Sequence, residues 1–290
     1  MISLLRSSFS DLSILGVMKI TVLIFLSYPV IFSIDRGNVD IWIFYLVSIS
    51  MLSYIEDRSF LAAISISIAI AFKGYPIVFV FLFILNKRFA LTAAVFVMSG
   101  FLTVIALNEF PGDIFDNFRA FLYNLSEFHR VYVIGGGSLF ASSDPYNMLR
   151  LIGMYIIKLQ GIAYPLDEVS KMIYRPYFLV SSILVLLSLC LLALSKDKSN
   201  MIVLVVLSII VLFYPHVSND YKLCILLVPL VLSLAGVIGP LPPSIFVLFM
   251  LLIVPKSIFF INGRSISMVI NPLLLMSSFV LILWQIIKSE

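Results

Sequence analysis

Apolar runs that follow one another with only short polar breaks constrain this chain more than any other feature. Of its 290 residues, 62% are hydrophobic and 12% are charged, whereas soluble domains carry roughly 25% charged residues. We therefore predict an all-α, polytopic transmembrane helical bundle of about ten spans, forming a single membrane domain over residues 1–290. The predicted spans are 13–34, 41–55, 59–72, 75–86, 89–107, 176–195, 200–214, 222–238, 243–260 and 266–287.

Several of these runs are shorter than the roughly 20 residues that a perpendicular transmembrane helix needs. The run 59–72 ends at the sequence "KGYP", residues 73–76. Polar breaks of this kind are tolerated at membrane depth where the backbone lines a cavity. The pattern predicts broken helices that end partway through the membrane.

The long interruption at 108–175 is the largest departure from the apolar pattern. It interleaves aromatic and acidic residues, then has a glycine triplet at 135–137. Further on, residues 147–166 place apolar side chains at helical spacing, with Arg150 and Lys158 on the other face. This pattern favours an amphipathic helix in the outer interface of the membrane. The alternative is a further spanning helix, which would reverse the orientation of everything after it.

The distribution of basic residues among the loops indicates the orientation of the bundle. Cytoplasmic N- and C-termini place Arg58, Lys87 and Arg88 in short inner loops, as the positive-inside rule prefers. The outer segments hold as many basic residues as the inner loops. The orientation is therefore assigned mainly from the positions of the polar clusters. Every unusual polar cluster lies on the outer face of this multi-pass arrangement, and we expect the protein to act there.

Several classes of function are excluded by what the sequence lacks. The net charge of +4 is dispersed, so nucleic acid is not an expected partner. The "GGGS" at 135–138 lacks the strand and helix of a phosphate loop and is interpreted as a flexible joint. His129 and His216 have no third ligand beside them, so we expect ordinary hydrogen bonds and no metal. No cofactor is expected.

The two cysteines give little functional information. Cys190 and Cys224 both lie inside apolar runs, where a free cysteine behaves as a small hydrophobic residue. We predict that both are buried, with no disulfide between them.

Three cations are expected at the outer ends of neighbouring spans: Arg36, Lys73 and Lys222. An ionisable residue at membrane depth is a functional hypothesis by default, although a lysine that reaches the interface is an ordinary alternative. Cations that converge on one cleft would suit an anionic ligand such as the phosphate of a lipid carrier.

The sequence "SIDRGNVDIW", residues 33–42, concentrates polar residues between two apolar runs. Gly37 permits a sharp turn, and Asn38 and Asp40 can satisfy the amides that open the next helix. Asp35 and Asp40 lie close enough to pair with Arg36, and we favour that structural role over catalysis.

The order of these motifs resembles a known family. "RGNVD", a span, a short basic loop, a span that ends in "KGYP", and then "NKR" are similar to polyprenyl-phosphate-sugar-dependent glycosyltransferases of the GT-C superfamily, family 87 above all. The sequences "GGGSLFASSDPYNML" and "YPHVSNDYKLCILLVPL" also resemble outer segments of that family. The resemblance covers roughly residues 15–235.

By that resemblance, the protein transfers a sugar, with mannose as the candidate, from a polyprenyl-phosphate donor to a lipid-linked or glycan acceptor on the outer face of the cytoplasmic membrane. Membrane lipids surround it. The candidate base residues are Asp35, Asp40 and Asp220; the candidate donor phosphate-binding residues are Arg36, Lys73 and Lys222; the candidate turn and cleft residues are Gly37, Asn38, Tyr75, Pro76, His216 and Tyr221. Family members usually take the base from an earlier outer loop. Either this chain is a truncated or degenerate member, or Asp35 or Asp40 has taken that role.

Two other classes of protein fit the same pattern. A polysaccharide polymerase or a lipid-linked oligosaccharide flippase is also polytopic and rich in aromatic residues. A flippase would need a cationic cavity but no base. A non-catalytic remnant of the glycosyltransferase family is the third possibility.

Overall fold

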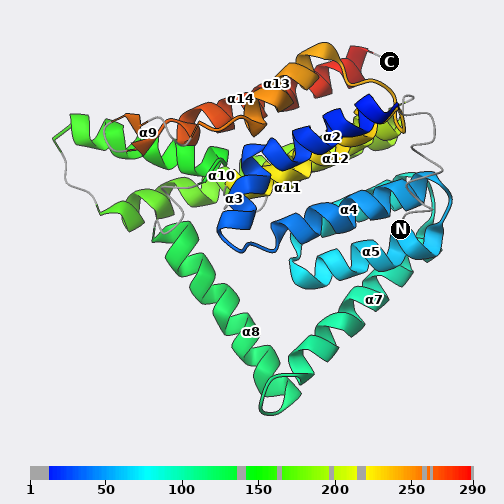
Figure 1. Cartoon of the computed structure of the whole chain (residues 1–290). Helices are drawn as coiled ribbons and strands as arrows, with labels where there is room; N and C mark the ends of the chain where they lie inside the picture. Colours follow the sequence, from blue (N-terminus) through cyan, green and yellow to red (C-terminus); the bar gives the residue numbers. More distant parts are fainter. Residues whose placement is uncertain are drawn as a thin grey trace.

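The computed structural model describes residues 13–135, 142–161, 165–195, 199–213, 220–256, 260–261 and 264–288. Within these ranges the chain is helical apart from one short antiparallel hairpin, in which β1 (Phe260–Ile261) pairs with β2 (Arg264–Ser265). The all-α prediction is therefore confirmed for the part of the chain described, and the helices form an elongated bundle (Figure 1).

The first half of the chain supplies a series of short helices and one long one. Their bounds are α2 (Ile14–Leu26), α3 (Tyr28–Asp35), α4 (Asp40–Ile55), α5 (Ser59–Phe72), the 3₁₀ helix η1 (Tyr75–Val80), α6 (Phe81–Leu85) and α7 (Phe89–Asn108). An amphipathic helix and a single π-helical turn follow: α8 (Ile114–Phe128) and η2 (His129–Ile134).

The second half contains the most deeply buried helices. Their bounds are α9 (Pro145–Leu159), α10 (Leu166–Leu194), α11 (Asn200–Phe213), the 3₁₀ helix η3 (Asp220–Leu226), α12 (Leu227–Leu234), α13 (Pro243–Ile253) and α14 (Ser267–Lys288).

The core is centred on α11, where every residue from Ile202 to Phe213 is buried. A helix that is apolar all round is either a membrane span open to lipid or a helix enclosed by others, and α11 is enclosed. The helices α12 and α14 pack against α11, α4 packs against α12, and α5 packs against α4. Figure 1 shows these helices as stacked layers, with α13 and α14 on the opposite side of α11 from α4 and α5.

Two helix breaks position the polar residues. The axis bends by 51° between α2 and α3, where Ser27 is extended and Pro29 stands in the first turn of α3. The helix α5 ends because Lys73 is extended, with φ −151° and ψ 136°. Pro76 then opens η1, since proline suits a first helical turn. The break expected at "KGYP" is therefore present.

The membrane character of the chain rests on its apolar helices. Among the described residues, α7, α10 and α14 are long and apolar enough to cross a bilayer, and α2 with α3 would be a fourth as one bent span. The helices α4, α5, α11 and α13 are apolar but shorter. Most of the predicted runs overlap helices, but the run predicted at 243–260 is helical only to Ile253, and residues 260–261 are in β1. The chain is a membrane protein, whereas a count of about ten spans stays a prediction.

Three expectations need correction. The segment 108–175 is not a loop with one helix, because α8, η2, α9 and the beginning of α10 occupy most of it. Arg150 is not on a polar outer face; its side chain is fully buried. Cys224 is buried as predicted, but Cys190 is exposed on α10, because α10 packs on the bundle through few of its side chains.

Candidate functional site

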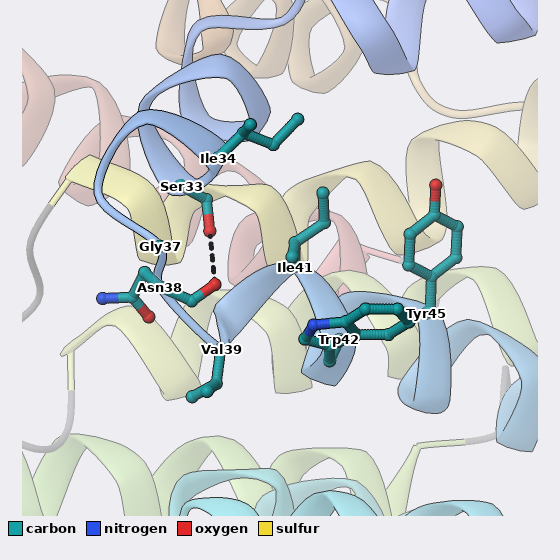
Figure 2. Close-up of a pocket in the computed structure, with 8 residues that line it drawn as sticks. All are labelled: Ser33, Ile34, Gly37, Asn38, Val39, Ile41, Trp42 and Tyr45. Atoms are coloured by element: carbon teal, nitrogen blue, oxygen red, sulfur yellow. Dashed lines mark hydrogen bonds between the residues drawn. The ribbon is translucent and has the colours of Figure 1, made fainter.

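The turn between α3 and α4 places the first group of polar residues. Gly37 has a φ of +58°, a conformation that favours glycine, as its place in "DRGN" predicts. The Ser33 hydroxyl donates to the Asn38 carbonyl at 3.2 Å (Figure 2). The Asn38 side-chain oxygen accepts from the backbone amide of Asp40 at 3.0 Å. The turn is thus closed by its own polar groups and fixes the beginning of α4.

Asp40 is the centre of this site, and its side chain is fully buried. The Lys73 ammonium donates to Asp40 Oδ2 at 2.5 Å, and the Tyr75 hydroxyl donates to Asp40 Oδ1 at 2.5 Å. Lys73 also donates to Asn38 Oδ1 at 3.2 Å. The break after α5 therefore carries a cation and a phenol to the beginning of α4.

Aromatic rings connect the three predicted cations. Lys222 Nζ lies 4.5 Å from the centroid of the Tyr75 ring, and Lys73 Nζ lies 5.4 Å from that of Tyr221. Contacts of this kind are attractive because the ring face is negative. We call Asp40, Lys73, Tyr75, Tyr221 and Lys222 the Asp40 cluster.

Arg36 joins the Asp40 cluster from the side. Its guanidinium lies 5.3 Å from the Phe32 ring centroid, and Phe32 stacks on Tyr221 with centroids 6.1 Å apart. The expected pairing of Arg36 with Asp35 is present but long, at 3.9 Å between exposed side chains. The expected pairing of Arg36 with Asp40 is wrong, because Asp40 is bound to Lys73 instead.

The three cations differ in their exposure. The side chain of Arg36 is 66% exposed and that of Lys73 is 33% exposed, whereas Lys222 is buried behind the Tyr75 ring. A ligand at this end of the bundle would meet Arg36 and Lys73 directly. Lys222 would act on it only through the electrostatic field.

A pocket of about 340 Å³ lies beside the turn. Figure 2 shows it between the end of α3 and the first turns of α4. Ser33, Gly37 and Asn38 form its polar end, and Trp42 and Tyr45 form part of its apolar end. The pocket therefore leads from the polar turn to an aromatic surface.

Asp220 lies in a second buried group. Ser143 Oγ donates to Asp220 Oδ1. Asn271 Nδ2 lies 3.4 Å from the same oxygen and 2.8 Å from Ser143 Oγ. Asn271 Oδ1 is buried and has no hydrogen-bond partner among the described residues. We call Ser143, Asp220 and Asn271 the Asp220 cluster.

Asp144 extends this polar region along α9. It is the N-cap of α9 and accepts from the Asn147 amide at 2.9 Å and from Asn147 Nδ2 at 2.8 Å. Arg150 Nη1 then donates to Asn147 Oδ1 at 2.8 Å, and its guanidinium lies 5.2 Å from the Tyr146 ring centroid. The role of Asp144 as a helix N-cap was not predicted, although "SSDP" has the Asp-Pro order typical of a helix N-terminus.

The acids of the long segment are engaged locally. Asp113 caps α8 by accepting from the Phe115 amide at 2.7 Å. Asp116 pairs with Arg119 at 3.3 Å. Hydrogen bonds from Arg130 lower the pKa of the Glu127 carboxyl. None of these described contacts brings an acid to either cluster.

The structure does not describe every predicted residue. His216 and the second and third glycines of the triplet at 135–137 lie outside the described residues. His129 packs edge-on against Tyr174, with centroids 4.9 Å apart. Among the described residues, no group of three or more His, Cys, Asp or Glu side chains could hold a metal ion.

The fold and the site define a class: a helical membrane protein with cations and aromatic rings gathered around a buried acid. A family model described as Glycosyltransferase family 87 matches residues 2–217. The chain therefore belongs to glycosyltransferase family 87, a family of membrane transferases that act on a sugar donor and an acceptor. Neither a curated protein nor a solved structure matches the chain.

Proposed function

We propose that this chain transfers a sugar from a polyprenyl-phosphate donor to a lipid-linked or glycan acceptor on the outer face of the cytoplasmic membrane. The sugar is a hexose, with mannose as the first to test. Both termini are cytoplasmic in this proposal. The observation that carries it is the Asp40 cluster with Arg36 beside it. Together they bring two accessible cations, Arg36 and Lys73, and one buried cation, Lys222, to the end of a bundle of apolar helices.

The donor phosphate would contact Arg36 and Lys73. Charge-assisted hydrogen bonds to phosphate are stronger than neutral ones, and these two cations are the accessible members of the set. Asp40 holds Lys73 in place, and Asn38 shares the same ammonium. In the reaction the cations would stabilise the charge that develops on the leaving phosphate.

The base would be Asp35. A general base must come within hydrogen-bond reach of the acceptor hydroxyl. The carboxylates of Asp40 and Asp220 are buried and already accept hydrogen bonds. The Asp35 side chain is 73% exposed and adjoins Arg36, the more accessible cation. Of the three candidate acids, Asp35 is thus the one whose carboxylate an acceptor hydroxyl can reach.

The test is sugar transfer by the purified chain in nanodiscs, with radiolabelled polyprenyl-phosphate-mannose as donor. A general base contributes about 100-fold or more to the rate, so Asp35→Asn should lower kcat by at least about that factor. Lys73→Met and Arg36→Gln should raise the donor KM. Asp116→Asn and Lys171→Met are matched controls, because both residues are exposed and paired within their own helices.

Three outcomes would contradict the proposal. Equal activity of Asp35→Asn and Asp116→Asn would exclude Asp35 as the base. Binding of the donor with no transfer by the wild-type chain would favour a non-catalytic member of the family. Movement of the labelled lipid between leaflets without transfer would favour a flippase.

A further inference from the structure

The helix α8 has two distinct faces. At 100° per residue, its apolar side chains fall on one side of the axis and its charges on the other. The apolar face contains Ile114, Phe115, Phe118, Phe121, Leu122, Leu125 and Phe128. The opposite face contains Asp116, Arg119, Tyr123 and Glu127. Such a helix needs a surface for its apolar side.

The described part of the chain does not supply that surface. No residue of α8 is buried, and five of its apolar side chains are 42% to 51% exposed: Phe118, Phe121, Leu122, Leu125 and Phe128. The helix packs on α7 at one end and on η2 at the other. In Figure 1, α7 and α8 form a V whose tip points away from the rest of the bundle, while α7 packs on α5.

The connection to α7 places one end of α8 at the membrane surface. The helix α7 is a 20-residue membrane-span candidate, and only 11% of its apolar window is buried by protein, so its sides are available to lipid. It ends at Asn108, and α8 begins at Ile114. Asn117 Nδ2 donates to the carbonyls of Leu107 and Phe110 at 3.0 and 3.1 Å. The start of α8 is therefore fixed at the point where α7 ends.

The length and charge of α8 indicate how it lies. Fifteen residues extend over about 22 Å, which is less than the roughly 30 Å hydrocarbon core of a bilayer. Its charges are paired with neighbours, Asp116 with Arg119 at 3.3 Å and Glu127 with Arg130 at 2.6 Å. No excess charge is left to select a charged protein partner, whereas an aromatic apolar face opposite a neutralised polar face suits a lipid interface.

We propose that α8 lies flat on the membrane surface, with its aromatic face among the lipid headgroups and upper acyl chains. The lipid then covers the face that the protein leaves open. Since η2 follows α8 directly, this contact also holds η2 at the level of the membrane surface. The inference does not depend on sugar transfer.

Tryptophan fluorescence tests the orientation. Trp42 and Trp284 are first replaced by Phe, and one Trp is then introduced, as Phe118→Trp or Tyr123→Trp. Both positions are exposed surface of α8, on opposite faces. The full chain is reconstituted into phosphatidylcholine vesicles with or without brominated acyl chains. Because bromine quenches only nearby indoles, Phe118→Trp should be quenched at least about twofold more than Tyr123→Trp.

A second pair keeps the test independent of one substitution. Leu125→Trp and Glu127→Trp stand two residues apart on opposite faces, and the first should be quenched more strongly. Equal bromolipid quenching of the two faces in both pairs would overturn the proposal. So would protection of Phe118→Trp from both bromolipid and aqueous acrylamide, because that result would mean that protein covers the face.

Discussion

The Asp40 cluster and the Asp220 cluster both enclose a carboxylate, but different groups donate hydrogen bonds to it. Asp40 is bound by an ammonium and a phenol, and its lysine partner is one-third exposed. Asp220 is bound by the hydroxyl of Ser143 and the amide of Asn271, all of them buried. The first arrangement is charged and reaches the surface, whereas the second is closed.

This difference separates a binding site from a structural one. A cation at a surface that is held by a buried acid can exchange part of its interaction for an anionic ligand. Hydroxyl and amide donors that are enclosed on all sides instead rigidify the helices that carry them. The Asp40 cluster therefore suits recognition, and the Asp220 cluster suits the joining of α9, η3 and α14.

Loss of the Lys73 charge should have the largest effect. Breaking a buried ion pair by removing one partner costs about 3–5 kcal/mol, and we expect the low end because Lys73 is one-third exposed. Lys73→Met should lower the free energy of unfolding by that amount in a denaturant titration in micelles. The double variant Lys73→Met with Asp40→Asn should recover much of the loss. Absence of such recovery would mean that the pair does not stabilise this site.

Removal of the Tyr75 hydroxyl should have a smaller effect. A hydrogen bond to a charged group contributes about 1.5–3 kcal/mol, and Asp40 keeps its lysine in Tyr75→Phe. The same titration should show a loss near the low end of that range, while the ring remains beneath Lys222. Tyr155→Phe, at an exposed position, is the control. Equal stability of the two variants would show that the phenol adds nothing to the Asp40 cluster.

The turn that supports Asp40 can be tested with a pair of glycines. Gly37 has a φ of +58°, so Gly37→Ala should cost about 1–2 kcal/mol. Gly74 has a φ of −64° and nothing within 4 Å of an added Cβ, so Gly74→Ala should not destabilise the chain. Thermal unfolding in detergent measures both. Equal midpoints for the two variants would contradict the strain argument.

Neutralisation of Asp220 should have the smallest effect. In Asp220→Asn one oxygen remains to accept from Ser143. The expected change in the free energy of unfolding is within about 1 kcal/mol. Asp40→Asn should cost more, because it leaves Lys73 without its acid. If Asp220→Asn destabilised the chain more than Asp40→Asn, the proposed difference between the two clusters would be wrong.

Sequence patterns predicted which residues gather at the Asp40 cluster better than how they pair. Each of Arg36, Lys73 and Lys222 ends or begins an apolar run, and this local signal was sufficient to expect them together. The partner of Asp40 was not predictable in this way. Arg36 is nearer along the chain, but the reversal at Gly37 and the end of α5 bring Lys73 to Asp40 instead.

The misplacement of Arg150 has a similar cause. Helical periodicity puts a charged residue on a polar face, and it takes no account of a partner on the same helix. Asn147 accepts from Arg150, the Ile134 carbonyl accepts a second hydrogen bond, and Tyr146 lies against the guanidinium, so two of its three nitrogens are engaged inside the protein. The amphipathic spacing of α8, in contrast, is visible in the sequence at 114–128. This helix was not predicted because residues 108–146 were interpreted as a loop.

One short helix belongs to both clusters. Asp220 and Lys222 stand two residues apart on η3, and in a 3₁₀ helix such side chains point about 120° apart around the axis. Each therefore enters a different polar group from the same rigid turn. The first turn of η3 is therefore a shared support. A displacement of that turn would disturb the Asp40 cluster and the Asp220 cluster together.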